Sequence, residues 1–169
     1  MRLLEWSVVG REMSAPDSVI ENLRTGIEEA FSNADPPDSD NVIEHDCPEC
    51  RAVRRVFRHQ PWRKLKPEKI EWGHDKMSLF TPHAFQYFLP AFMLYALDEP
   101  SSIVCELLVN SLIVPKETED WRKRLDEFTW SQKAACRIFL RWVQRQPGFA
   151  SESDDIEKAI AERWQIESG

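Results

Sequence analysis

Apolar residues recur along most of this chain at intervals of three and four, the spacing that places side chains on one face of a helix. The first such stretch covers residues 16–33, and an acidic, proline-rich segment at 35–40 then predicts a loop. We expect the helix to bury one face made of six residues: Val19, Ile20, Leu23, Ile27, Ala30 and Phe31.

The segment 81–97 is apolar nearly all round, so we expect it to form the centre of the core. It opens with Thr81 and Pro82, a capping residue followed by a residue that suits the first helical turn. Pro90 removes an amide donor and crowds the preceding turn, which predicts a kinked or broken, hairpin-like piece. A second mostly apolar helix follows at 102–113, capped by one of the two serines at its start.

The C-terminal third of the chain predicts three further helices. A short one lies near 118–127, and the last covers about 153–165. Between them, Thr129 and Gln132 form a capping box that opens a helix reaching about residue 146. The face that this middle helix should bury consists of Ala135, Ile138, Phe139, Trp142 and Val143. No alternating pattern of convincing length is present, so the sequence predicts an all-α fold of about six or seven helices.

The length of the chain and its N-terminal pattern set the expected domain organisation. Residues 1–12 carry no helical pattern, although their apolar residues allow a short strand, and Met13 is a plausible alternative start. We therefore expect 1–12 to be an N-terminal extension and 13–169 to be a single compact helical domain, long enough to bury a substantial core.

Composition and charge narrow the classes of partner. Hydrophobic residues make up 42% of the chain and charged residues 30%, which is typical of a globular protein. A net charge of −7 argues against free nucleic acid as a ligand, because phosphate binding needs a basic surface. The chain has no apolar run long enough to span a membrane and no signal peptide at its start, and its few cysteines suit a reducing compartment. These features predict a cytoplasmic protein.

The segment His45-Asp46-Cys47-Pro48-Glu49-Cys50 is the strongest chemical motif of the chain. Asp46 is expected to cap a helix that starts here, with Glu49 completing a capping box. Both thiols would then lie in the first turn, where amide donors and the helix dipole stabilise a thiolate.

This motif supports three alternatives: metal binding, redox exchange and plain packing. Zinc would use His45, Cys47 and Cys50 as ligands, and it is the one cofactor that the sequence suggests. A fourth ligand would be water or one of His59, His74, His83, Cys105 and Cys136. Against zinc, the chain lacks a second closely spaced pair of ligands. Against redox exchange, the motif does not follow a clear strand.

Three segments together resemble a family of small bacterial proteins of unknown function. They are the HDCxEC segment at 45–50, the block at 79–92 that is similar to LTPxAFxYFLPA, and the capped helix at 129–140, and the resemblance covers about 16–145. It implies a bacterial, cytosolic, helical protein and no particular activity.

Two functional hypotheses follow. The first is a non-catalytic, acidic helical binding protein of the immunity or accessory type, which acts on a partner protein; it rests on the negative charge, the many aromatic residues and the absence of familiar catalytic motifs. The alternative is a zinc-binding or thiol-redox protein built on the cysteine motif. We assign no catalytic residue, and the partner and the oligomeric state stay open.

Overall fold

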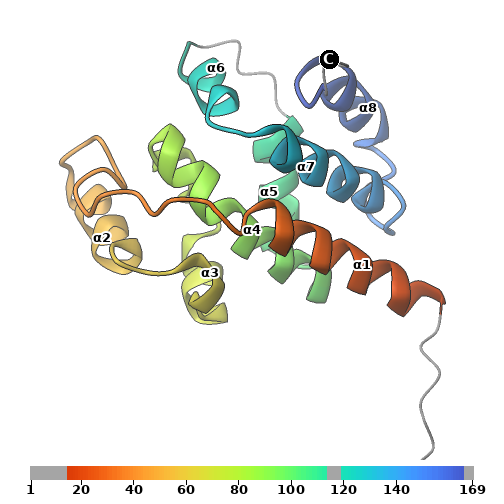
Figure 1. Cartoon of the computed structure of the whole chain (residues 1–169), viewed down its shortest axis with the longest axis horizontal. Coiled ribbons are helices and arrows are strands. Elements are labelled where there is room, and N and C mark those ends of the chain that lie inside the picture. Colours follow the sequence, from red (N-terminus) through yellow and green to blue (C-terminus); the bar gives the residue numbers. More distant parts are fainter. Residues whose placement is uncertain (1–14, 114–118, 166–169) are drawn as a thin grey trace, which may run out of the picture.

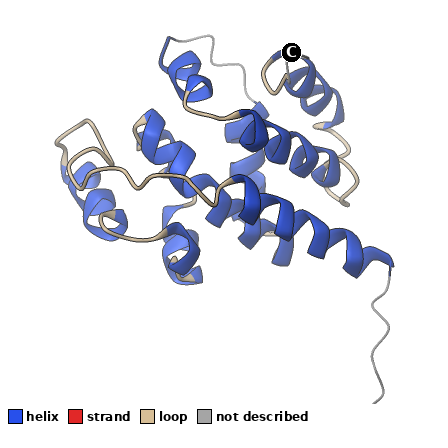
Figure 2. Ribbon diagram, viewed as in Figure 1, coloured by secondary structure: helices blue, strands red, loops and turns tan. Residues whose placement is uncertain are grey.

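The structure, a computed structural model, describes residues 15–113 and 119–165, and within these ranges helices are joined by loops and no strand is present (Figures 1 and 2). The α-helices within these ranges are α1 (Ala15–Ala30), α2 (Pro48–Phe57), α3 (Pro67–Gly73), α4 (Pro82–Asp98), α5 (Ile103–Ile113), α6 (Glu119–Asp126), α7 (Trp130–Val143) and α8 (Ser153–Glu162). Two short 3-10 helices, η1 (Trp62–Lys64) and η2 (Met77–Leu79), flank α3. The prediction of an all-α fold is confirmed, and the proposed extension at 1–12 lies outside the described residues.

Helix α4 is the centre of the fold, as its apolar sequence predicted. It packs against α1, α3, α5 and α6, and most of its side chains are buried (Figure 1). The expectation at Pro90 was a kink or a break; the break and the hairpin were wrong, because α4 continues as one helix to Asp98, and the kink stays a prediction. Pro90 is itself buried, and packing on all sides of α4 offsets the one backbone hydrogen bond that proline removes.

The helix starts that the sequence predicted at 81, 102 and 129 are confirmed by their capping hydrogen bonds. The Thr81 hydroxyl oxygen accepts from the Ala84 amide at 3.1 Å, and the Ser102 hydroxyl oxygen accepts from the Cys105 amide at 3.2 Å. Thr129 forms the complete capping box of α7. Each cap satisfies an amide that the first turn leaves without a helical partner.

Phe57 attaches the end of α2 to the central helix through a cluster of aromatic rings. Its ring centroid lies 4.9 Å from that of Phe80, 5.2 Å from that of Phe88 and 6.4 Å from that of Phe92. All four side chains are fully buried or nearly so. Because large rings supply much of the free energy of burial, this cluster fixes where α2 and its first turn sit.

Gly73 and Gly26 offer a matched pair of substitutions. A Cβ atom at Gly73 would lie 2.5 Å from the Phe57 ring, whereas one at Gly26 would meet no atom within 4 Å. We expect Gly73→Ala to destabilise the protein by about 1–3 kcal/mol through overpacking. Gly26→Ala should stabilise it by roughly 0.5–1 kcal/mol, because alanine favours the helix. Urea denaturation of both variants measures the difference, and equal stabilities would contradict this packing.

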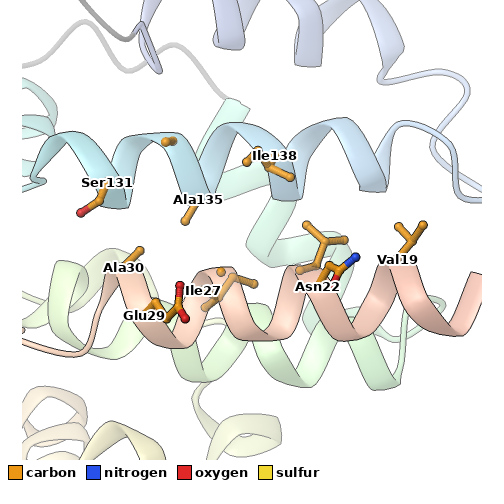
Figure 3. A pocket seen from close by; sticks show the side chains of 11 residues that line it. Val19, Asn22, Ile27, Glu29, Ala30, Ser131, Ala135 and Ile138 are labelled. Atoms are coloured by element: carbon orange, nitrogen blue, oxygen red, sulfur yellow. The ribbon is translucent and has the colours of Figure 1, made fainter.

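Two residues that we expected in the core are exposed: Val19 on α1 and Ile138 on α7. The two helices lie side by side (Figure 1) and bury Leu23, Ile27 and Ala135, but not the outer edge of either apolar arc. Sequence spacing identifies the apolar side of a helix, but it does not show how much of that side a neighbour covers. Both exposed residues flank the same groove between α1 and α7 (Figure 3).

Candidate functional site

The thiol pair lies at the start of α2, with Cys47 as the capping residue. The prediction that Asp46 caps this helix was wrong. Cys47 has extended backbone angles, φ −101° and ψ 166°, and the helix begins at Pro48. The reason is local, since proline disfavours the helical conformation in the residue before it and fits the first helical position itself.

Its capping role gives the Cys47 sulfur a hydrogen bond from the first turn of α2. The Cys50 amide donates to the Cys47 sulfur at 3.1 Å, and the two sulfur atoms lie 2.7 Å apart. Cys47 is half-buried, whereas only 2% of Cys50 is exposed. A reagent arriving from solvent therefore meets the Cys47 sulfur first.

The same geometry moves the pKa values of the two thiols in opposite directions. With Cys47 ionised, the hydrogen bond from the Cys50 thiol lowers the pKa of Cys47, and the Cys50 amide adds to this effect. The sulfur contact with Cys47 raises the pKa of Cys50, and burial raises it further. The site thus combines an accessible thiol that ionises easily with a buried thiol that holds its proton.

This asymmetry predicts the pH dependence of alkylation. Only the thiolate reacts with iodoacetamide, so a lowered pKa moves the rise in reaction rate to lower pH. Cys47 should reach half of its maximal rate at a lower pH than an ordinary thiol does, and Cys50 should do so at a higher pH. Peptide mapping after timed labelling gives the two profiles. Coincident profiles, or a faster Cys50, would contradict the assignment.

Arginine and lysine side chains hold the segment around the thiols in place. The Arg54 guanidinium donates to the backbone oxygens of Ile43 at 3.0 Å and His45 at 3.2 Å, fixing the chain just before Cys47. Lys76, which lies between α3 and η2, forms an ion pair with Glu49 at 2.8 Å. This ion pair connects the first turn of α2 to the turn that follows α3. No sequence spacing indicated these two contacts, because each joins residues from separate segments.

The structure does not bring the expected zinc ligands together. His45 is exposed, and no group of three His, Cys, Asp or Glu side chains in the described ranges is arranged to hold a metal ion. His59 lies beyond the far end of α2, about 15 Å along a ten-residue helix. His83 contacts Glu127 and the Asp35 carbonyl, and His74 contacts the Glu71 carbonyl. Zinc binding by Cys47 and Cys50 stays a prediction.

The sulfur separation lies between the value for a disulfide and the value for a pair of zinc ligands. Two cysteines on one tetrahedral zinc ion, each about 2.3 Å from the metal, place their sulfurs roughly 3.8 Å apart. The sulfurs of Cys47 and Cys50 are 2.7 Å apart, and a disulfide needs about 2.05 Å. Bond formation between them therefore requires less movement than opening the pair around a metal would.

The other two cysteines are core residues. Cys105 and Cys136 are completely buried. Burial raises the pKa of Cys105 to about 11 and raises that of Cys136 still further above its ordinary range. Both thiols stay protonated and out of reach, so Cys47 and Cys50 in the first turn of α2 are the pair available for thiol chemistry.

Fold and site together define an all-helical protein with one asymmetric thiol pair at a helix start. The chain belongs to a family of unknown function, DUF6714, whose model matches residues 21–168. This agrees with the resemblance drawn from the sequence motifs. Searches of curated proteins and of solved structures gave no match. None of the described helices is long and apolar enough to cross a membrane.

Proposed function

We propose that the protein carries out thiol–disulfide exchange, with Cys47 as the attacking thiolate and Cys50 as the resolving thiol. The geometry of the thiol pair carries the proposal. The Cys47 sulfur accepts a hydrogen bond from the Cys50 amide and lies 2.7 Å from the buried Cys50 sulfur. Cys47 is also partly open to solvent. A lowered pKa at an accessible thiol, next to a second thiol that can displace the product, is what exchange requires.

A disulfide substrate accepts the two electrons that the Cys47–Cys50 dithiol loses. The Cys47 thiolate attacks one sulfur of the substrate, the substrate S–S bond breaks, and a mixed disulfide forms on Cys47 as the other substrate sulfur leaves as a thiolate. Cys50 then loses its proton to that thiolate and attacks the Cys47 sulfur, which releases the second substrate thiol. Two electrons have passed to the substrate, and the protein holds a Cys47–Cys50 disulfide. A thiol such as glutathione reverses these steps and restores the dithiol.

A bacterial cytoplasm, the location that the sequence favours, suits this chemistry. Disulfides are mostly transient there and serve catalysis or redox sensing. The other hypothesis, an acidic protein that acts on a partner protein, stays compatible with exchange, because the substrate disulfide can belong to a protein. No contact among the described residues identifies such a partner, and zinc binding is the alternative use of the same thiols.

The experiment that tests the proposal follows the exchange between reduced glutathione and bis(2-hydroxyethyl) disulfide. We expect the protein to accelerate formation of oxidised glutathione above the rate with glutathione alone. The matched control is the Cys47→Ser/Cys50→Ser double variant, which keeps the buried cysteines. Equal rates for the wild-type protein and this control would contradict the proposal.

A further inference from the structure

The proline-rich loop that follows α1 forms one wall of two adjoining cavities. Residues 31–47 connect α1 to α2 (Figure 1), and Pro36, Pro37, Asp38 and Asn41 of this segment line both cavities. The larger cavity, about 830 Å³, extends to the end of α2 and to α4. The smaller one, about 440 Å³, extends to the start of α4 and to the connection between α6 and α7. Because they share four residues, the two cavities form one continuous cleft, the loop cleft.

Carboxylates outnumber cations along the loop cleft. Among the described residues that line it there is no lysine or arginine, and there are five carboxylates: Asp35, Asp38, Asp40, Glu44 and Glu127. His83 contacts Glu127 at 3.3 Å, and Lys69 reaches the edge of the cleft, where it donates to the Gln60 side-chain oxygen at 2.9 Å. Even with His59, which also lines the larger cavity, these neighbours do not balance the carboxylates. The cleft therefore favours a positively charged ligand.

Tyr87 provides an independent observation that points to a ligand. It lines the larger cavity beside Phe57 and Phe88, although only 5% of this tyrosine is exposed. Its hydroxyl has no hydrogen-bond partner within the described residues and is not sealed in the core, so it opens into the cavity. The hydroxyl of Tyr95, the other tyrosine of the chain, donates to Glu71 at 2.7 Å. Buried tyrosines usually have such a partner, so Tyr87 presents an unused hydroxyl to a molecule that enters the cavity.

We propose that the loop cleft binds a small organic polycation, an aliphatic amine with two or more ammonium groups. The carboxylates occur along both cavities, so separated positive charges match them better than a single charge does. Pro36 and Pro37 give the shared wall an apolar surface, on which the methylene groups between the ammonium groups pack. The Tyr87 hydroxyl oxygen accepts a charge-assisted hydrogen bond from the ammonium group in the larger cavity. Neither Cys47 nor Cys50 lines the cleft, so this site does not depend on the proposed exchange.

Equilibrium dialysis of the full chain against labelled spermidine tests the proposal. We expect saturable binding at one site per chain, with an affinity that falls as salt rises because exposed charges are screened. Asp38→Asn removes the carboxylate that lines both cavities and should weaken binding by roughly tenfold. Glu68→Gln is the matched control, since it removes an exposed carboxylate of α3 outside the cleft and should leave binding unchanged. An equal loss in both variants would mean non-specific attraction to an acidic protein and would overturn the site.

A hydroxyl deletion tests the role of Tyr87 without changing the net charge. Tyr87→Phe should weaken spermidine binding by roughly fivefold to tenfold, the effect of one lost hydrogen bond to a charged group. It should leave the stability in urea unchanged, because the hydroxyl has no partner among the described residues. Tyr95→Phe is the matched control and should bind spermidine as the wild-type protein does. A wild-type protein that binds no spermidine, or a Tyr87→Phe variant that binds it as tightly as the wild type, would overturn the proposal.

Discussion

A Cys50→Ser variant should accumulate a mixed disulfide with glutathione on Cys47. In the wild-type protein Cys50 resolves this species, because its sulfur lies 2.7 Å from that of Cys47. A serine at position 50 cannot attack the mixed disulfide, so the reaction stops after its first step. Intact mass spectrometry after exposure to oxidised glutathione should show one added glutathione, and peptide mapping should place it on Cys47.

The Cys47→Ser variant provides the complementary result. Its remaining thiol at the site is buried, so exchange with oxidised glutathione should slow by roughly tenfold to a hundredfold, following the smaller thiolate fraction and poorer access. Cys105 and Cys136 serve as internal controls, because both are buried in either variant and should stay unmodified. Glutathione found on Cys50 of the Cys47→Ser protein at the wild-type rate would reverse the assigned roles.

The second large effect is expected at Phe57, which joins α2 to the central helix. Phe57→Ala should destabilise the protein by about 3–5 kcal/mol, since the removed ring contacts three buried rings and leaves a cavity. Chemical denaturation measures the loss. Phe57→Leu should recover much of it, because leucine refills most of the space.

Trp72→Ala is the matched control for Phe57. Trp72 is an aromatic residue of α3 that is 41% exposed, and its removal should cost clearly less than that of Phe57. A Phe57→Ala loss as small as that of Trp72→Ala would mean that α2 does not depend on the aromatic cluster. The position of the thiol pair would then need another explanation.

Local sequence signals predicted most of the helices and three of their caps, because a cap depends on residues within one turn. The same kind of signal was available at Cys47 and was misread. Aspartate is a more common capping residue than cysteine, which favours Asp46. Pro48, however, forces the residue before it out of the helical conformation, and this makes Cys47 the cap. The capping position matters for function, because it gives the Cys47 sulfur a hydrogen bond from the Cys50 amide.

The features that could not be predicted all depend on contacts between distant segments. Burial of α4 on all sides keeps the helix intact at Pro90, although proline favours a break when a helix is considered alone. The contacts of Arg54 and Lys76 that hold the thiol segment cross between elements. Val19 and Ile138 are apolar residues on apolar faces, and only the packing of α1 on α7 shows that both remain exposed.

The most direct test of the proposed exchange is an equilibrium titration of the protein in glutathione buffers of stepped redox ratio. After an acid quench, free thiols are alkylated and mapped, and zinc is measured in the same untagged sample. Exchange predicts one two-electron transition in which Cys47 and Cys50 form a disulfide, with zinc absent. Thiols that stay reduced at every ratio, or one zinc per chain that is lost on substitution of the pair, would contradict it.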